Sequence, residues 1–160
     1  MIILVDTREQ NPLSFSHPYV ENTRACTLDV GDYSAIMADG HQPTIFFERK
    51  SIPDLFGTFT TGYQRFREEI RRSRQSGVEL ILIIEGTVTD ILKGTKYSQV
   101  DGLQILRTVL SIYDRYQITH IFCRNREEMS TYIAERFCSY ERKRQKDKKC
   151  IDSPQSPTQS

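Results

Sequence analysis

The order of hydrophobic and polar positions divides the chain into short strands and helices. Runs of apolar and β-branched residues predict strands over residues 2–5, 24–30, 33–38, 44–50, 79–85 and 118–123. Apolar residues at helical spacing predict helices over residues 51–57, 62–75, 100–116 and 126 to about 146. The most apolar strand, 79–85, is expected to be parallel and to lie inside the sheet. This order of elements predicts an α/β fold with a mixed central sheet flanked by helices.

The composition is that of an ordinary globular domain, since 38% of the 160 residues are hydrophobic and 27% are charged. Apolar runs such as Leu80–Ile84 are far shorter than the roughly 20 residues of a membrane-spanning helix. The four cysteines form no CxxC pair, and Met1 runs straight into the first strand without a leader. We therefore expect free thiols in an intracellular protein, nuclear in a eukaryote and cytoplasmic in a prokaryote or virus.

Positive charge is concentrated at the C-terminus. Residues 141–160 carry a net charge of +3, whereas the rest of the chain carries −2. This division predicts a folded domain over residues 1–140 and a basic tail over residues 141–160, disordered beyond about residue 149. The basic run 142–149 suits a sequence-independent phosphate binder or a nuclear import signal, as well as a segment that only keeps the chain soluble.

Acidic residues stand at or near the ends of four predicted strands, which is where α/β proteins commonly place their active sites. Within the fourth strand, the alternation of side chains puts Glu48 and Lys50 on one face and Arg49 on the other. Glu85, just before a glycine, better fits a structural role. The four acidic residues are Asp6, Asp32, Glu48 and Glu85.

A carboxylate beside an ammonium group suits phosphodiester hydrolysis. Glu48 would hold a divalent cation, while Lys50 steadies an attacking water or the developing phosphate charge. Because Mg²⁺ usually takes one or two protein carboxylates, Asp32, on an adjacent predicted strand, is the natural second ligand. On its own, such a pattern also fits exposed charges in ion pairs.

Short motifs in order along the chain resemble the nuclease domain of the XPF-type structure-specific endonucleases. That family has a VDxRE-like first strand, then GD, then ERK, then an Asp a few residues on. The resemblance covers about residues 2–125 and is densest over residues 2–86. The matching segments are Val5-Asp6-Thr7-Arg8-Glu9, Gly31-Asp32-Tyr33, Glu48-Arg49-Lys50-Ser51, Asp54-Leu55 and Gly62-Tyr63-Gln64-Arg65-Phe66.

The resemblance implies a restriction-endonuclease-like fold and hydrolysis of phosphodiester bonds that depends on Mg²⁺ or Mn²⁺. By this resemblance, Asp32 and Glu48 match the metal-binding carboxylates, and Asp6 is expected to complete the metal shell. Lys50 matches the catalytic lysine. Arg49 matches the family's arginine, which is expected to support the site and to contact phosphate.

Three further residues match positions of the family that support the site. Arg8 and Glu9 are expected to orient their neighbours, although an ion pair between Arg8 and Glu9 or Asp6 is an open alternative. Asp54 matches the trailing aspartate of the family. It also fits a negative charge at a helix N-terminus, where the helix dipole favours it.

The predicted helix that begins at Gly62 is rich in arginine. We expect Arg65 and Arg72 to bind backbone phosphates, with Arg65 nearest the catalytic edge, and Tyr63 to line the path of the DNA. The same run of charges also suits a solvated helix face.

The sequence therefore predicts a metal-dependent DNA endonuclease that acts on branched DNA, such as flaps or forks, in repair or recombination. The alternative is a non-catalytic DNA-binding partner subunit of an active nuclease, against which the intact Asp32, Glu48 and Lys50 argue. A restriction-like nuclease that cuts plain duplex ends or RNA would differ only in its substrate. The helix-hairpin-helix tandem of many family members has no match among these residues.

Besides DNA, a homodimer or heterodimer through the C-terminal helices is expected, because the family's nuclease domains pair through late helices and strands. Two apolar helix faces suit such an interface. They are formed by Leu103, Leu106, Val109, Leu110 and Tyr113, and by Met129, Ile133 and Phe137.

Overall fold

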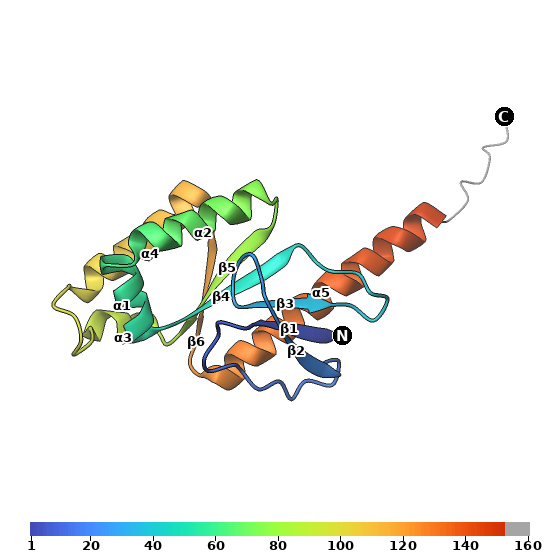
Figure 1. Cartoon of the computed structure of the whole chain (residues 1–160), viewed down its shortest axis with the longest axis horizontal. Coiled ribbons are helices and arrows are strands. Elements are labelled where there is room, and N and C mark those ends of the chain that lie inside the picture. Colours follow the sequence, from blue (N-terminus) through green and yellow to red (C-terminus); the bar gives the residue numbers. More distant parts are fainter. Residues whose placement is uncertain (153–160) are drawn as a thin grey trace.

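A six-stranded mixed sheet forms the centre of the protein in the computed structural model, which describes residues 1–152 (Figure 1). The strands lie in the order β2-β1-β3-β4-β5-β6. β3 runs antiparallel to its neighbours β1 and β4, and the remaining pairs are parallel. The predicted mixed sheet is thus confirmed. The strands are β1 (Ile2–Asp6), β2 (Asn22–Cys26), β3 (Tyr33–Ile36), β4 (Ile45–Ser51), β5 (Glu79–Glu85) and β6 (Thr119–Cys123).

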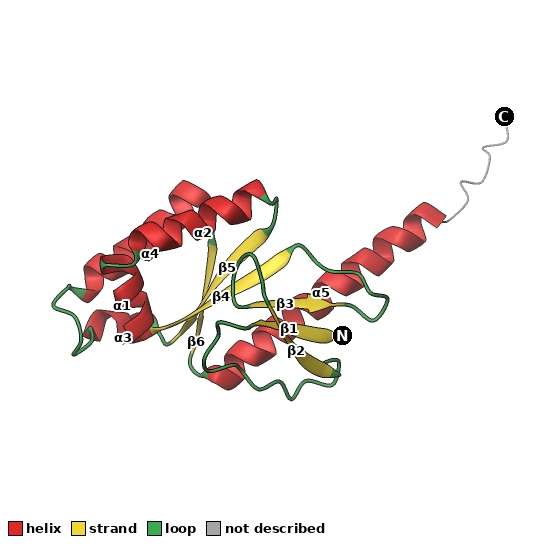
Figure 2. Cartoon of the chain, viewed as in Figure 1, coloured by secondary structure: helices red, strands yellow, loops and turns green. Residues whose placement is uncertain are grey.

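Helices cover both faces of this sheet (Figure 2). Residues of α1, α2, α3 and α4 form one apolar cluster with the sheet, and residues of α5 form a second cluster on the opposite face. The helices are α1 (Ile52–Thr60), α2 (Tyr63–Gln75), α3 (Val88–Lys93), α4 (Gly102–Tyr116) and α5 (Arg126–Asp152).

β5 shows why both faces of the sheet are covered. Ile81 and Ile83 belong to the cluster that contains α5, whereas Leu80, Leu82 and Ile84 belong to the cluster of α1, α2 and α4. All five side chains are at most 2% exposed. A strand that is apolar on both faces is stable only between two layers. Its parallel pairing with β4 and β6 confirms the predicted interior position.

The apolar stripe of α5 faces the sheet. Met129, Ile133 and Phe137 are each 0% exposed and belong to the α5 cluster. Their predicted role in a subunit interface is therefore wrong. Helical spacing of apolar residues marks a face that is buried, and it does not distinguish a core from an interface.

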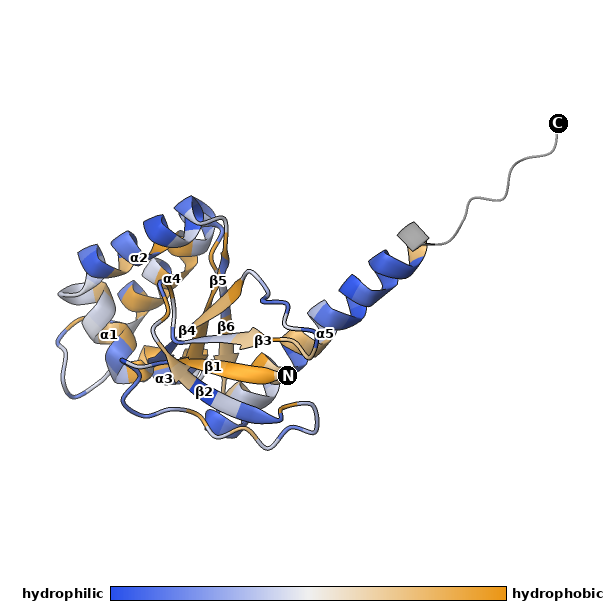
Figure 3. Cartoon of the chain, turned by 45° about the vertical axis from the view of Figure 1, so that its right-hand side comes forward, coloured by the Kyte–Doolittle hydropathy of each residue, from blue (hydrophilic) through white to orange (hydrophobic). Residues whose placement is uncertain are grey.

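α5 is longer than predicted. It continues to Asp152, where the sequence predicted an end near residue 146, so residues 141–152 of the predicted tail are helical. Figure 3 shows that the outer part of this helix is mostly hydrophilic. Residues 153–160, on which part of the predicted disorder falls, lie outside the described residues. The division into a domain and a tail at residue 140 stays a prediction.

The loop between β3 and β4 is fastened to α5. His41 Nε2 lies 2.8 Å from the hydroxyl of Tyr140, and the two rings are stacked. Farther along the helix, Arg144 Nη2 donates to Asp39 Oδ2 at 2.6 Å. The end of the β3–β4 pair that is remote from Asp32 is thus held by the C-terminal helix.

Two elements differ from the sequence prediction for local reasons. β2 ends at Cys26 and does not reach residue 30, because the backbone N–H of Leu28 turns to donate to the Asp6 carboxylate at 2.7 Å. The short helix α3 escaped prediction because its six residues are too few to show a helical period. It is held by a capping box, in which Thr87 and Asp90 bond to each other's backbone N–H.

The remaining expectations concern cysteines and membranes. The four cysteines are free thiols, as predicted. Within residues 1–152, none of the helices is both long and apolar enough to span a membrane.

Candidate active site

Asp32 lies in the turn that leads into β3 and is held against β4. Its backbone N–H donates to the carbonyl of Phe47 at 2.7 Å, and its own carbonyl accepts from the N–H of Asp6 at 2.8 Å. Its carboxylate Oδ2 accepts from the backbone N–H of Arg49 at 2.8 Å. Backbone groups of two strands therefore fix the position of this side chain.

The residue before Asp32 has to be a glycine. Gly31 has a φ of +68°, and a Cβ atom built on it would lie 2.8 Å from the carbonyl oxygen of Phe47. Both the positive φ and the close approach disfavour any side chain. The Gly-Asp motif thus follows from how closely this turn approaches β4.

Glu48 and Lys50 share one face of β4 and form an ion pair. Burial, followed by the nearby charge of Asp32, raises the pKa of Glu48 to about 8, and burial raises the pKa of Asp32 to about 6. Burial disfavours the charged form of Lys50, but the neighbouring Glu48 outweighs this effect and raises the pKa of the ammonium group. Two acidic groups are therefore held close together where solvent stabilises their charges poorly.

Arg49 points to the opposite face of β4, as the alternation of the strand requires. Its Nε donates to Glu9 Oε2 at 3.2 Å, and its Nη1 donates to Glu85 Oε2 at 3.0 Å. The Arg49 side chain is only 10% exposed. In this arrangement it joins β4 to the β1 turn and to β5, and it does not reach the face that carries Glu48. Glu9 and Glu85 are thus both paired with Arg49, and the orienting role expected of Glu9 stays a prediction.

Asp6 has its hydrogen-bonding capacity occupied by protein groups. Its Oδ1 accepts from the backbone N–H of Arg8 at 2.8 Å and from Arg8 Nε at 2.6 Å. Its Oδ2 accepts from Arg8 Nη2 at 3.0 Å and from the N–H of Leu28 at 2.7 Å. Burial opposes ionisation of Asp6, but these hydrogen bonds outweigh it and lower the pKa. The geometry favours a structural ion pair with Arg8 over the predicted place in a metal shell.

An open groove of about 940 Å³ brings most of the predicted site residues together, between the Gly31 turn on one side and α1 and α2 on the other. Tyr63 lies outside this lining and packs edge-on against Phe59, with ring centroids 6.2 Å apart. Asp6, Glu9 and Arg49 also lie outside it. The predicted residues that line the groove are Arg8, Asp32, Glu48, Lys50, Asp54, Arg65 and Arg72.

Asp54 lies at the N-terminus of α1 and also at the groove. Ser51 Oγ donates to Asp54 Oδ2 at 2.6 Å, and the N–H of Asp54 donates back to Ser51 Oγ at 3.3 Å. This exchange caps the N-terminus of α1, which continues past Gly57 to Thr60. The same aspartate also forms part of the groove wall.

Glu69 of α2 is a groove residue that the sequence analysis missed. Its Oε1 accepts a hydrogen bond from the backbone N–H of Gly31 at 2.9 Å, and its side chain lines the groove. Its negative charge also helps to raise the pKa values of Asp32 and Glu48. A signal was present, since Glu69 lies four residues after Arg65 and therefore on the same face of α2.

The donor set of the groove fits a divalent cation that prefers oxygen ligands. Glu48 supplies a buried carboxylate and Asp32 a partly buried one, and a cation would relieve their mutual repulsion. Within the described part of the chain, no group of three or more His, Cys, Asp or Glu side chains is arranged to hold a metal ion. Two carboxylates nevertheless match the usual protein share of a Mg²⁺ site, which water and phosphate oxygens complete.

Two solved structures are similar in fold to this chain. The structure of XPF from Aeropyrum pernix matches with a TM-score of 0.60 at 18% identity, covering 83% of this chain and 61% of that one. The structure of XPF from Aeropyrum pernix in complex with DNA matches with a TM-score of 0.63 at 18% identity, covering 88% and 66%. This chain therefore spans less than two thirds of either XPF chain, and the likeness confirms the restriction-endonuclease-like fold.

The sequence itself was compared with curated proteins and with family models. The comparison with curated proteins gave no match. The model of the ERCC4 domain matches residues 5–135, which is more than half of the chain and includes all of the predicted catalytic motifs. The chain belongs to the ERCC4 domain family.

Proposed function

We propose that the protein is a metal-dependent DNA endonuclease whose active site is the groove over Asp32, Glu48 and Lys50. The observation that carries this proposal is that these three side chains, which come from a turn and a strand sixteen or more residues apart in sequence, line one groove. Membership in the ERCC4 domain family supports the proposal, as does the likeness to an XPF structure in complex with DNA.

Asp32 and Glu48 would hold Mg²⁺ or Mn²⁺. When bound, such an ion supplies Lewis acidity that polarises the scissile phosphate and favours formation of the attacking hydroxide. Burial and the nearby charge of Asp32 raise the pKa of Glu48, so its carboxyl group takes up a proton more readily when no metal is bound. A cation would displace that proton and would compete with Lys50 for the carboxylate.

Lys50, once released from Glu48, is placed to steady the attacking water and the charge that develops on the phosphate. It is on the same face of β4 as Glu48 and lines the groove. In-line attack would leave 3′-hydroxyl and 5′-phosphate ends, as the family resemblance implies. The proton of the water would pass to solvent at the open side of the groove, because Lys50, whose pKa is raised, stays an ammonium group and can only donate.

The groove offers cations for the DNA backbone on both walls. Arg65 and Arg72 lie on the α2 wall, and Arg8 lies on the opposite wall with its side chain 63% exposed. Guanidinium groups bind phosphate oxygens without regard to base sequence, so they would position the scissile strand. Branched DNA such as a flap or fork is the proposed substrate, in repair or recombination.

α4 supplies the proposed subunit interface. Its Leu103, Leu110 and Tyr113 side chains are 40%, 47% and 47% exposed, which is high for large apolar residues on one helix. The proposed homodimer or heterodimer would form through this face of α4, because the apolar stripe of α5 is buried against the sheet.

The protein is proposed to work inside the cell, in the nucleus of a eukaryote or the cytoplasm of a prokaryote or virus.

The test is cleavage of a labelled 3′-flap duplex with and without Mg²⁺ or Mn²⁺. Wild type is compared with Asp32→Ala and with Asp114→Ala, which removes an exposed carboxylate on α4, remote from the groove. We expect metal-dependent cutting by wild type and Asp114→Ala, and a loss of at least about 100-fold in Asp32→Ala. Equal DNA binding by all three proteins without any cutting would favour a non-catalytic partner subunit.

A further inference from the structure

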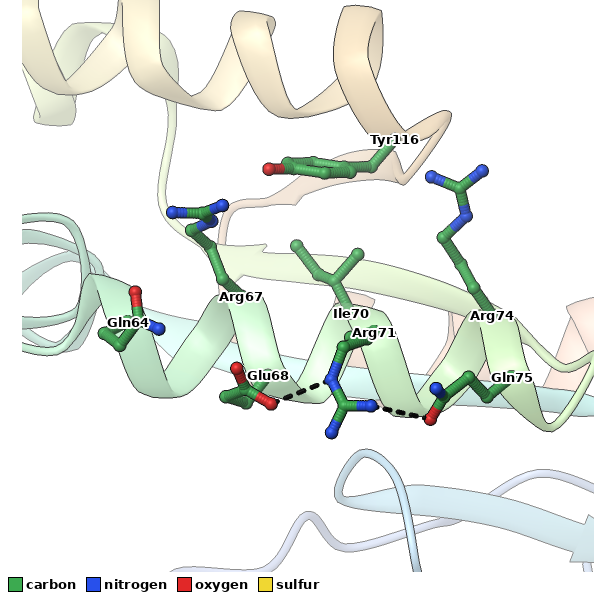
Figure 4. A pocket seen from close by; sticks show the side chains of 8 residues that line it. All are labelled: Gln64, Arg67, Glu68, Ile70, Arg71, Arg74, Gln75 and Tyr116. Atoms are coloured by element: carbon green, nitrogen blue, oxygen red, sulfur yellow. Dashed lines mark hydrogen bonds and ion pairs between the residues drawn. The ribbon is translucent and has the colours of Figure 1, made fainter.

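α2 carries arginines on two separate faces. Arg65 and Arg72 line the catalytic groove, whereas Arg67, Arg71 and Arg74 line a second cavity of about 430 Å³ between α2 and the end of α4 (Figure 4). At 3.6 residues per turn, positions seven apart return to the same side of the helix, and positions two apart lie far round it. The catalytic site therefore leaves the second row of arginines unexplained.

Two arginines of the second row have charges that the protein does not neutralise. Arg71 donates to Glu68 at 2.9 Å and to Gln75 at 3.0 Å. Arg67 and Arg74, by contrast, form no ion pair with any residue of the described range 1–152. Figure 4 shows Tyr116 between these two side chains, above Ile70. An aromatic wall with an uncompensated cation at each end suits a ligand that carries more than one negative charge.

The spacing of the two cations indicates an extended polyanion. Arg67 and Arg74 are seven residues apart, which is about 10 Å along a helix axis. Phosphates of one strand rise by about 3.4 Å per nucleotide along the axis of a DNA duplex and also rotate about it, so cations about 10 Å apart suit phosphates one or two nucleotides apart. A single phosphate group could engage only one of the two guanidinium groups.

We propose that the cavity between α2 and the end of α4, called the α2–α4 groove below, binds the phosphate backbone of a second DNA strand. This strand is distinct from the strand in the catalytic groove. The helix with its side chains is about 10–12 Å thick and stands between the two grooves, so one strand would have to cross over it to occupy both. Two strands of a branched or duplex substrate reach both sides without that detour. The inference rests on the proposed function, because it names the second strand of the same substrate.

The phosphate contacts are tested by the salt dependence of binding to a 3′-flap duplex in EDTA, where no cleavage occurs. The double variant Arg67→Ala/Arg74→Ala is compared with Arg24→Ala/Arg115→Ala, which removes two exposed arginines outside both grooves. Each lost phosphate contact lowers the slope of log affinity against log salt by about 0.9, so the double variant should lose about 1.8. Between 50 and 200 mM salt, its affinity would then fall about 12-fold less than that of wild type. An unchanged slope, or an equal change in the control pair, overturns the proposal.

The identity of the strand is tested by photo-crosslinking. A photoreactive amino acid is placed at Gln64, which lines the α2–α4 groove, or at Thr61, which lines the catalytic groove. We expect the two positions to label different strands of the flap substrate. Labelling of the same strand from both positions, or no labelling from Gln64, overturns the second-strand assignment. Because neither readout needs cleavage, a failed nuclease assay and a failed strand assignment are told apart.

Discussion

The carboxylate of Asp32 accepts a hydrogen bond from the backbone N–H of Arg49, at 2.8 Å. This bond joins the Gly-Asp turn to the middle of the Glu-Arg-Lys motif, so each motif holds the other in place. One oxygen of Asp32 is used in this contact, and Asp32 lines the groove together with Glu48 and Lys50. The two motifs are therefore one structural unit, although sixteen residues separate Asp32 from Glu48.

The raised pKa values predict how stability depends on pH in the absence of metal. Glu48 and Asp32 titrate near pH 8 and 6 when folded, above their ordinary values of 4.5 and 3.8. At a pH between the ordinary and the raised pKa of each group, the folded state binds more protons than the unfolded state. The free energy of unfolding therefore falls as the pH rises from about 4 to 8. Denaturation in EDTA across this range should show the fall in wild type and a smaller one in Glu48→Gln. Identical pH profiles for the two proteins would contradict it.

The same protons should oppose metal binding at low pH. Because a cation must displace the proton of Glu48, Mn²⁺ should raise the thermal midpoint more at pH 8 than at pH 6. Calorimetric titration with Mn²⁺ at both pH values checks this. An equal affinity at both would place the ion elsewhere.

Gly31→Ala should destabilise the protein through both its backbone and its neighbours. A non-glycine residue at a φ of +68° costs about 1–2 kcal/mol, and the contact of its Cβ with Phe47 about 1–3 kcal/mol more. Gly40→Ala is the matched control, because Gly40 has a φ of +83° but its Cβ would meet no atom within 4 Å. Urea denaturation should give the larger loss for Gly31→Ala. Equal losses would mean that the turn moves away from β4 freely.

Glu69 should act on the metal site through Gly31 and through its charge. Glu69→Gln keeps an acceptor for the Gly31 N–H but removes the charge, so we expect a stability near that of wild type and a metal affinity reduced about 10-fold. Glu69→Ala should lower both the stability of the protein and its metal affinity. Glu68→Gln is the control, since Glu68 pairs with exposed Arg71 on another side of α2. Calorimetry with Mn²⁺ separates the three variants, and an unchanged affinity in Glu69→Gln would leave Glu69 a purely structural contact.

Arg49 and Lys50 should fail in different ways. Arg49→Ala leaves the carboxylates of Glu9 and Glu85 without their shared cation, and the cost to the free energy of unfolding should be about 3 kcal/mol. Lys50→Ala should abolish cleavage with a smaller loss of stability, because the raised pKa of Glu48 lets that carboxyl group take up a proton when its cation is removed. Chemical denaturation and single-turnover cleavage of the flap substrate measure the two effects. Loss of cleavage in a well-folded Arg49→Ala protein would return Arg49 to the catalytic group.

The exposed face of α4 predicts self-association. Sedimentation velocity at micromolar concentration should show a dimer, and Leu110→Lys should shift it toward monomer because it places a charge among Leu103 and Tyr113. A wild-type monomer under these conditions would rule out a homodimer.

The sequence was sufficient for residues whose neighbours are set by strand geometry. Glu48 and Lys50 share a face because side chains alternate along a strand, and Asp32 joins them because β3 pairs with β4. The same alternation places Arg49 on the opposite face, as expected from the sequence, and the phosphate contact that the family resemblance implies for Arg49 stays a prediction.

The features that could not be predicted from the sequence depend on contacts between elements that are distant in the chain. Glu69 reaches Gly31 only because α2 packs beside the β3 turn, 38 residues away. Asp6 is held by Leu28 because the chain doubles back, so that the Leu28 N–H donates to its carboxylate. The apolar stripe of α5 has a sequence pattern that would be the same whether it packs against the sheet or against another subunit.

The β3–β4 pair is fastened at both ends, which bears on the metal binding proposed for Asp32 and Glu48. At one end, Glu69 accepts a hydrogen bond from the Gly31 N–H. At the other end, Arg144 donates a hydrogen bond to Asp39 in the loop between the two strands. A pair of strands held at both ends has little freedom to shift, and the Asp32 carboxylate lies next to the end that is held at Gly31. An arriving cation would then find its ligands preorganised and would have little conformational entropy left to remove.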